Sequence, residues 1–218
     1  MGYVMKCNDS GPWQQWVDRY RKVEAAIRAG DIDRIQALLN QEARVTDYDF
    51  NGTDYLTLAA QLNKTEIGRL LIARGANVNH QNKDGDSALM FCGETGNVDL
   101  ARAILAVPYA NLNLRNCQLN TAAHLSVINM GSEKHPARGH HLSVLHVLGN
   151  DPRIDLKLRN SRNYTVYMEA ANVGHAEAMR FLASKEADTN IEDRPGHSIR
   201  PTIRHARARR QAELMMQK

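Results

Sequence analysis

The chain repeats itself at a spacing of about 33 residues, and this periodicity constrains its fold more than any other feature of the sequence. The segment GTDYLTLAAQLNKTEIGRLLIARGANVN begins at Gly52, and a similar segment begins 33 residues later at Gly85. One position of the repeated unit recurs along the chain at Asp54, Ser87, Thr121, Thr165 and Ser198. The step from Thr121 to Thr165 is 44 residues, so this unit carries an insertion of about 11 residues.

Each unit has the pattern of two antiparallel helices. The first contains small residues such as Ala59 and Ala60, which let neighbouring helices approach closely, and a Gly or Asn ends it. The second carries an apolar stripe with the i, i+3, i+4 spacing of a helix face, as in Ile67, Leu70 and Leu71. Short polar segments rich in Asn and Asp follow, which are typical of turns. The sequence therefore predicts stacked helix pairs joined by turns.

These units resemble the ankyrin repeat, whose pattern is roughly D-x-x-G-x-T-P-L-H-x-A-A-x-x-G-H-x-E-x-V-x-x-L-L-x-x-G-A-D-x-N. The second unit matches it at Asp49, Gly52, Leu56, Ala59, Ala60, Glu66, Leu70, Leu71, Gly75, Ala76 and Asn79. The fifth matches it at Asn160, Thr165, Ala170, Ala171, Gly174, His175, Glu177, Leu182, Ala187, Asp188 and Asn190. The resemblance covers about residues 20–200. It implies an all-α fold, an ankyrin-repeat solenoid of stacked antiparallel helix pairs linked by short β-hairpin-like turns.

The chain divides into three parts on this interpretation. We expect an N-terminal extension and the start of a capping helix over 1–19, an ankyrin-repeat domain over 20–200, and a basic C-terminal capping helix or tail over 201–218. The expected repeats lie near 20–48, 49–81, 82–115, 116–159 with the insertion, and 160–192. The insertion, centred on 131–139, is expected to be a mobile projection between the two helices of the fourth repeat.

Some residues depart from the family pattern. Leu119 and Asn163 stand where the other units have the turn glycine. Gly93 and Val127 replace the second small Ala. We therefore expect the third and fourth units to pack less regularly than the others.

The sequence gives no sign of catalysis. It contains no phosphate-binding loop, zinc-protease motif, C-x-x-C pair, nucleophile elbow or dinucleotide fingerprint. We therefore predict a protein that is not an enzyme, with no cofactor and no small-molecule substrate. No run approaches the roughly 18 apolar residues of a membrane span, and we expect neither a membrane span nor a secretory signal.

Three cysteines at unrelated spacings are typical of a reducing compartment, so we expect a cytoplasmic monomer. Cys92 takes the place of a buried Ala, whereas Cys117 should be exposed in a hairpin tip. The SALM and TVYM segments resemble bacterial ankyrin proteins, some of which are effectors delivered into host cells, where the cytoplasm would be that of the host.

Two alternative functions remain open. Five histidines gather around the insertion: His124, His135, His140, His141 and His146. They favour a metal-dependent function only weakly, because their spacing fits no zinc pattern. His124 and either His140 or His141 occupy histidine positions of the repeat, and His146 should be solvated.

The second alternative is binding of nucleic acid or an acidic partner by the tail. Its arginines Arg204, Arg207, Arg209 and Arg210 follow near-helical spacing, and the stretch from Arg194 to Lys218 has a net charge of +6. No aromatic residue follows Arg194 to stack on bases, which makes nucleic-acid binding the weaker interpretation.

The family resemblance implies a non-catalytic module that binds a protein partner. Proteins of this family bind with a concave surface made of hairpin tips and first helices. The expected partner-binding residues are those at the second, third, thirteenth and fourteenth places of each unit, together with Tyr164 at a fifth place: Phe50, Asn51, Gln61, Leu62, Lys83, Asp84, Glu94, Thr95, Cys117, Gln118, Ile128, Asn129, Ser161, Arg162, Asn172 and Val173. We expect their side chains to point away from the core.

Overall fold

The computed structural model describes residues 12–41, 44–130, 138–185, 187, 192–194 and 197–198. Within them ten helices form five consecutive pairs: α1 (Pro12–Ala29) and α2 (Ile32–Gln41), α3 (Tyr55–Gln61) and α4 (Thr65–Ala73), α5 (Ala88–Thr95) and α6 (Val98–Leu105), α7 (Ala122–Met130) and α8 (Arg138–Gly149), α9 (Val166–Val173) and α10 (Ala176–Ser184). A short antiparallel pair, β1 (Glu192–Arg194) and β2 (His197–Ser198), follows the last helix. The predicted helix pairs are thus confirmed.

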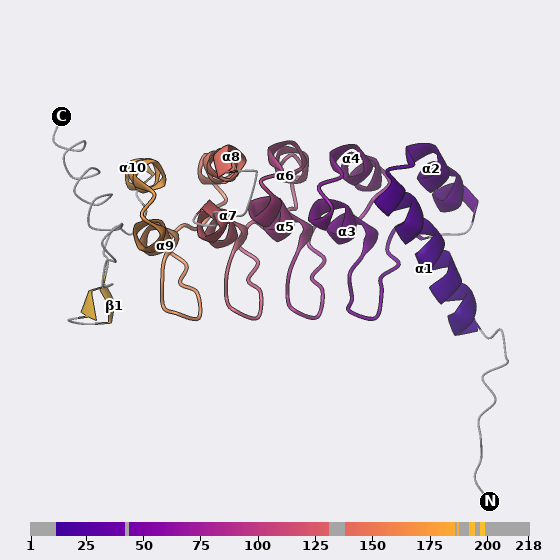
Figure 1. Ribbon diagram of the computed structural model, residues 1–218, viewed down its shortest axis with the longest axis horizontal. Helices are drawn as coiled ribbons and strands as arrows, with labels where there is room; N and C mark the ends of the chain where they lie inside the picture. Colours follow the sequence, from indigo (N-terminus) through magenta and orange to yellow (C-terminus); the bar gives the residue numbers. More distant parts are fainter. Residues whose placement is uncertain are drawn as a thin grey trace, which may run out of the picture.

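The pairs stack side by side in two layers (Figure 1). Helices α3, α5, α7 and α9 form one layer, and α4, α6, α8 and α10 form the other, with the loops before the first helices extending away from both layers (Figure 1). Backbone hydrogen bonds join successive loops, from the Lys83 N–H to the Asn51 carbonyl (2.9 Å), from Cys117 to Asp84 (2.8 Å) and from Ser161 to Gln118 (2.9 Å). These bonds keep the hairpin tips in register, so equivalent side chains line one surface.

The recurring polar residue that opens each unit caps the first helix. The Asp54 carboxylate accepts a hydrogen bond from the Thr57 N–H at 2.8 Å, and the Ser87 and Thr165 hydroxyls accept equivalent bonds in α5 and α9. An N-cap of this kind satisfies a backbone donor that the first turn leaves unpaired. The capping role explains why the repeat varies only among Asp, Ser and Thr here.

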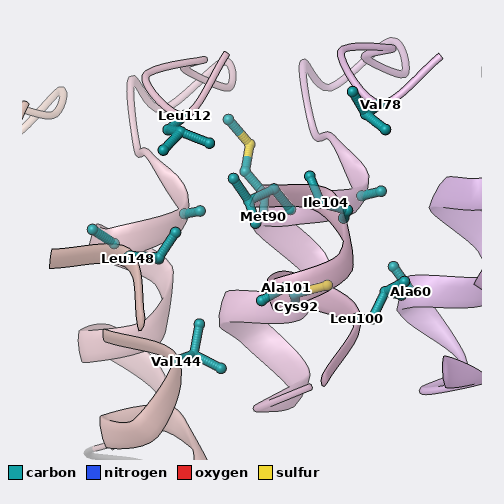
Figure 2. Close-up of a cluster of buried hydrophobic side chains, with 14 of the residues drawn as sticks. Ala60, Val78, Met90, Cys92, Leu100, Ala101, Ile104, Leu112, Val144 and Leu148 are labelled. Atoms are coloured by element: carbon teal, nitrogen blue, oxygen red, sulfur yellow. The ribbon is translucent and has the colours of Figure 1, made fainter. Parts of the chain in front are cut away.

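The predicted apolar stripes form the core. Leu71, Leu100, Ile104 and Leu182 are buried, as the spacing requires. Figure 2 shows how α6 presents Leu100, Ala101 and Ile104 beside Met90 and Cys92 of α5, while Val78 and Leu112 close the core from the turns. Each unit therefore buries its stripe against its own first helix and its neighbours.

Two departures from the repeat are accommodated differently from what the sequence suggested. A Cβ on Gly93 would lie 2.5 Å from the Ala122 carbonyl oxygen, so the glycine lets α5 and α7 approach closely where less regular packing was expected. Leu119 and Asn163 adopt φ of 57° and 63°, close to the 77° of Gly85 at the same place. The turn geometry is therefore preserved at the expense of backbone strain in Leu119.

The structure gives the starting residues of the first helix and of the helix that follows the insertion. Helix α1 runs without interruption through residues 19 and 20, so the capping residues and the first helix of the first unit are one element. Helix α8 begins at Arg138, inside the expected projection 131–139, because the helix extends one turn before the place where the other second helices begin. Residues 131–137 and the tail over 199–218 lie outside the described residues.

Candidate partner-binding surface

The structure places the predicted hairpin-tip residues on the surface. All eight are exposed: Phe50, Asn51, Lys83, Asp84, Cys117, Gln118, Ser161 and Arg162. Of the helix residues, Gln61 is exposed, and the remaining seven are half-buried: Leu62, Glu94, Thr95, Ile128, Asn129, Asn172 and Val173. Tyr164 is also half-buried. Every predicted position is thus accessible, but the helix places are less accessible than the tips.

The expectation that all these side chains point away from the core is wrong at two places. Leu62 and Val173 pack against the buried hydrophobic cluster. Both stand at the end of a first helix, where the chain turns into the second, so an apolar side chain there covers the contact between the two helices. Their contribution to partner binding would be mixed with a contribution to stability.

A recess of about 340 Å³ brings several predicted residues together. It lies between the third and fourth units and is lined by Asp84, Asp86, Glu94, Asn116, Cys117, Gln118, Leu125 and Asn129. Five of these eight were expected from their place in the repeat, and they come from hairpin tips and first helices of two units. The recess therefore forms on the surface that the family resemblance indicated.

Sequence reasoning missed Asp86, Asn116 and Leu125. The Asn116 side-chain amide donates a hydrogen bond to Asp86 at 2.8 Å, and this bond ties one hairpin to the next. Here the first residue of one unit contacts the fifth residue of the preceding unit. The same contact recurs one unit later between Asn160 and Asn120 at 3.0 Å, so a comparison of these two places along the sequence could have found the pair. Asp86 and Asn116, which line the recess, therefore also hold adjacent hairpins together.

The charge of the recess is negative. Three carboxylates line it, and its lining includes no Lys, Arg or His. Burial raises the pKa of Asp86, with the nearby Asp84 adding to the rise and the Asn116 hydrogen bond opposing it. The recess offers carboxylate and amide oxygens to a ligand, which suits hydrogen-bond donors of a partner.

Further along the surface, a buried acid holds two predicted residues in place. Glu169 is fully buried, and its Oε1 accepts hydrogen bonds from the Arg162 guanidinium and from the Asn160 amide (2.7 Å). Arg162 in turn lies 5.2 Å from the centre of the Tyr164 ring. Glu169 stands at the same place of its unit as Leu125 in the preceding unit. The only sign of its polar role in the sequence is therefore an acidic residue at a place where the preceding unit has an apolar one.

His124 and His141 are both buried and hydrogen-bonded within the helical stack. His124 is buried, with Nδ1 accepting from the Thr121 N–H and Nε2 donating to the Tyr164 carbonyl at 3.0 Å, and burial lowers its pKa to about 4. His141 is buried with Nδ1 at 3.1 Å from the Gly93 carbonyl, which identifies it as the repeat histidine rather than the exposed His140.

His146, expected to be solvated, is half-buried. Its ring centre lies 4.3 Å from that of Phe181, because α8 and α10 bring the two side chains together. Within the described part of the chain no group of three or more His, Cys, Asp or Glu side chains is arranged to hold a metal ion. His135 lies outside that part.

The cysteine predictions are confirmed. Cys92 is buried and Cys117 is exposed, and both are free thiols. Burial raises the pKa of the Cys92 thiol, which disfavours the reactive thiolate. Separately, no helix in the described ranges is long and apolar enough to cross a membrane.

Comparisons with known proteins agree with this geometry. A family model of ankyrin repeats in three copies matches residues 23–116 and residues 56–137, which together span more than half of the 218 residues. In the solved structure of EF0377, an ankyrin repeat protein, the same fold covers 91% of this chain and 98% of that one, with a TM-score of 0.75 at 23% identity.

Curated relatives include the ankyrin repeat and KH domain-containing protein mask-1 of Caenorhabditis elegans, 32% identical over 143 residues, or 66% of this chain. A putative ankyrin repeat-containing protein of Treponema pallidum is 35% identical over 104 residues, which are 47% of this chain and 35% of that protein. The match covers only 5% of the length of mask-1.

Proposed function

Because the chain belongs to the ankyrin-repeat family, we propose that it is a non-catalytic module that binds a protein partner through its concave surface. The observation that carries the proposal is the recess between the third and fourth units, where exposed Asp84, Cys117 and Gln118 meet half-buried Glu94 and Asn129. Binding surfaces concentrate their energy in a few such central positions.

Exposure of the hairpin tips supports the same conclusion. The hairpins are held together by backbone hydrogen bonds, as between the Cys117 N–H and the Asp84 carbonyl at 2.8 Å. The Gln118 side chain accepts one hydrogen bond, from the Asn120 amide of its own hairpin at 3.2 Å. A rigid backbone that presents replaceable side chains is the arrangement that recognition of a protein requires.

Partner capture followed by titration tests the proposal. A partner identified by affinity capture and mass spectrometry is purified and titrated against the Asp84→Ala/Gln118→Ala variant. The matched control is Asp99→Ala/Asn150→Ala, which removes one acidic and one neutral polar side chain, both exposed, from α6 and from the turn directly after α8. Both variants are first compared with the parent chain by thermal unfolding.

We expect the recess variant to lose at least about fivefold in affinity, corresponding to 1 kcal/mol or more, and the control to bind as the parent does. Equal affinity of both variants would remove the recess from the binding surface. Loss only on deletion of residues 199–218 would favour the tail instead.

We also propose a cytoplasmic location and a monomeric state, in an adaptor or effector role. Two free thiols in the described residues, one of them exposed, support a reducing compartment. Light scattering of the purified chain tests the monomer, with a mass of 24.5 kDa expected.

A further inference from the structure

A second recess, of about 230 Å³, lies at the N-terminal end of the stack. Helix α1 contributes Trp16, Val17, Tyr20, Arg21 and Glu24, and the first hairpin contributes Asp49, Phe50 and Asn51. Nothing in the repeat pattern predicted it, because its two walls come from different units, 34 residues apart at Trp16 and Phe50. We call it the aromatic recess.

Three aromatic rings form its walls. The Trp16 and Phe50 ring centres lie 5.7 Å apart in an edge-on arrangement, and Tyr20 lies 6.4 Å from Trp16. Phe50 is 65% exposed, so it does not seal the core as a capping residue would. A large aromatic side chain left in solvent beside two others is typical of a surface that meets a partner.

Two carboxylates stand beside these rings. Asp49 accepts hydrogen bonds through Oδ1 from the Asn51 and Thr53 N–H groups, each at 2.8 Å, which fixes its side chain at the base of the hairpin tip. Glu24 pairs with Arg28 at 2.9 Å. After burial, Asp49 and Glu24 are the main causes that raise the pKa of Tyr20, so their negative field reaches the floor of the recess.

The recess thus combines aromatic rings with two carboxylates and one guanidinium, that of Arg21; because Glu24 is already paired with Arg28, the carboxylate left for a cation is that of Asp49. Ring faces attract cations, and the aliphatic stems of Lys and Arg pack on apolar walls. A purely apolar side chain would gain nothing from the Asp49 carboxylate, and an anionic side chain would be repelled by it.

We propose that the aromatic recess binds a Lys or Arg side chain of the partner protein. The inference rests on the proposed function, since the side chain belongs to that partner. It adds a second contact, at the N-terminal end of the same surface, and it assigns the partner's chemistry there. Phe50 provides an exposed aromatic ring for the cation, and Asp49 provides the charge.

The test uses two capped tripeptides as probes, acetyl-Gly-Lys-Gly-amide and its norleucine counterpart, which has the same stem without the ammonium group. Binding is followed in the ¹⁵N-labelled full chain by the shift of the Trp16 indole N–H, assigned with Trp16→Phe. We expect the lysine peptide to bind about three- to tenfold more tightly than the norleucine peptide. Raised salt should weaken only the lysine peptide.

Three variants separate the causes. Phe50→Leu keeps an apolar side chain but removes the ring face, and it should weaken the lysine peptide about threefold or more. Asp49→Asn keeps an oxygen acceptor for the turn and removes the charge, and it should weaken the same peptide about two- to threefold. Tyr109→Leu is the matched control, because Tyr109 is also 65% exposed but lies elsewhere, and it should change nothing.

Equal binding of the two peptides, no shift at Trp16 with either, or equal effects of Phe50→Leu and Tyr109→Leu would each overturn the inference. None of these outcomes would overturn the proposed function, provided that the Asp84→Ala/Gln118→Ala variant binds the purified partner more weakly than the parent chain does. Failure of that partner titration would overturn the proposed function, whatever the lysine peptide does.

Discussion

Replacement of Gly93 by Ala tests how closely the first helices are packed. A Cβ there would lie 2.5 Å from the Ala122 carbonyl oxygen and 3.3 Å from the Ser126 nitrogen. Both are backbone atoms of α7, so α5 and α7 must move apart. Overpacking of this kind costs about 1–3 kcal/mol, and Ala gains about 1 kcal/mol over Gly in a helix. These two magnitudes leave a net loss of up to about 2 kcal/mol in the free energy of unfolding.

Gly68→Ala is the matched control. It is another buried glycine inside a helix, and its added Cβ would also meet an atom at 2.5 Å, but that atom is Cδ1 of the Leu100 side chain. A side chain can change rotamer at a cost of about 0.5–1.5 kcal/mol, which the helix gain offsets. This variant should therefore remain within about 0.5 kcal/mol of the parent chain.

Urea denaturation followed by circular dichroism at 222 nm measures both variants. The expected order is parent and Gly68→Ala nearly equal, with Gly93→Ala clearly less stable. A more stable Gly93→Ala, or an equal loss in both variants, would show that α5 and α7 are not held at a fixed backbone contact.

Three further predictions concern stability. Folding favours the neutral form of His124, because burial lowers its pKa to about 4. The free energy of unfolding should therefore be constant above about pH 6.5 and fall by up to about 3 kcal/mol as the pH drops towards 4. An NMR titration that places the pKa of His124 near 6.5 would contradict this. Leu119→Gly should raise the free energy of unfolding by about 0.5–1 kcal/mol, because Gly adopts the left-handed conformation without strain. Asn163→Gly should give a smaller gain, because Asn tolerates this conformation. A lower denaturation midpoint for Leu119→Gly would show that Leu119 is not strained. Leu71→Ala should cost about 2–5 kcal/mol because the side chain is fully buried, and an unchanged urea midpoint would contradict its place in the core.

Most of the fold could be predicted from the repeat because its signals are local. The spacing of Leu71 and the capping position of Asp54 depend on helix geometry, which the sequence encodes directly. Gly93 was misinterpreted because, within a single unit, the absence of a side chain suggests that a packing contact is lost. In three dimensions it permits a closer contact with the next unit.

The surface could be predicted in part. Positions such as Asp84 and Gln118 follow from the place of the hairpin tip in each unit, and the structure leaves both exposed. Leu62 could not be separated from its exposed neighbours, since its burial depends on the angle at which the chain turns into α4. The aromatic recess was missed because Trp16 and Phe50 meet only through the packing of α1 against the first hairpin.

A footprint of the partner on the full chain shows which surface of the stack binds it. The ¹⁵N-labelled protein is titrated with the purified partner, and the shifts of the backbone amides are mapped. We expect the largest shifts at the hairpin tips, including Asn51, Asp84 and Gln118, with few in α4, α6 and α10. Shifts concentrated in those outer helices, or confined to residues 199–218, would contradict binding through the concave surface.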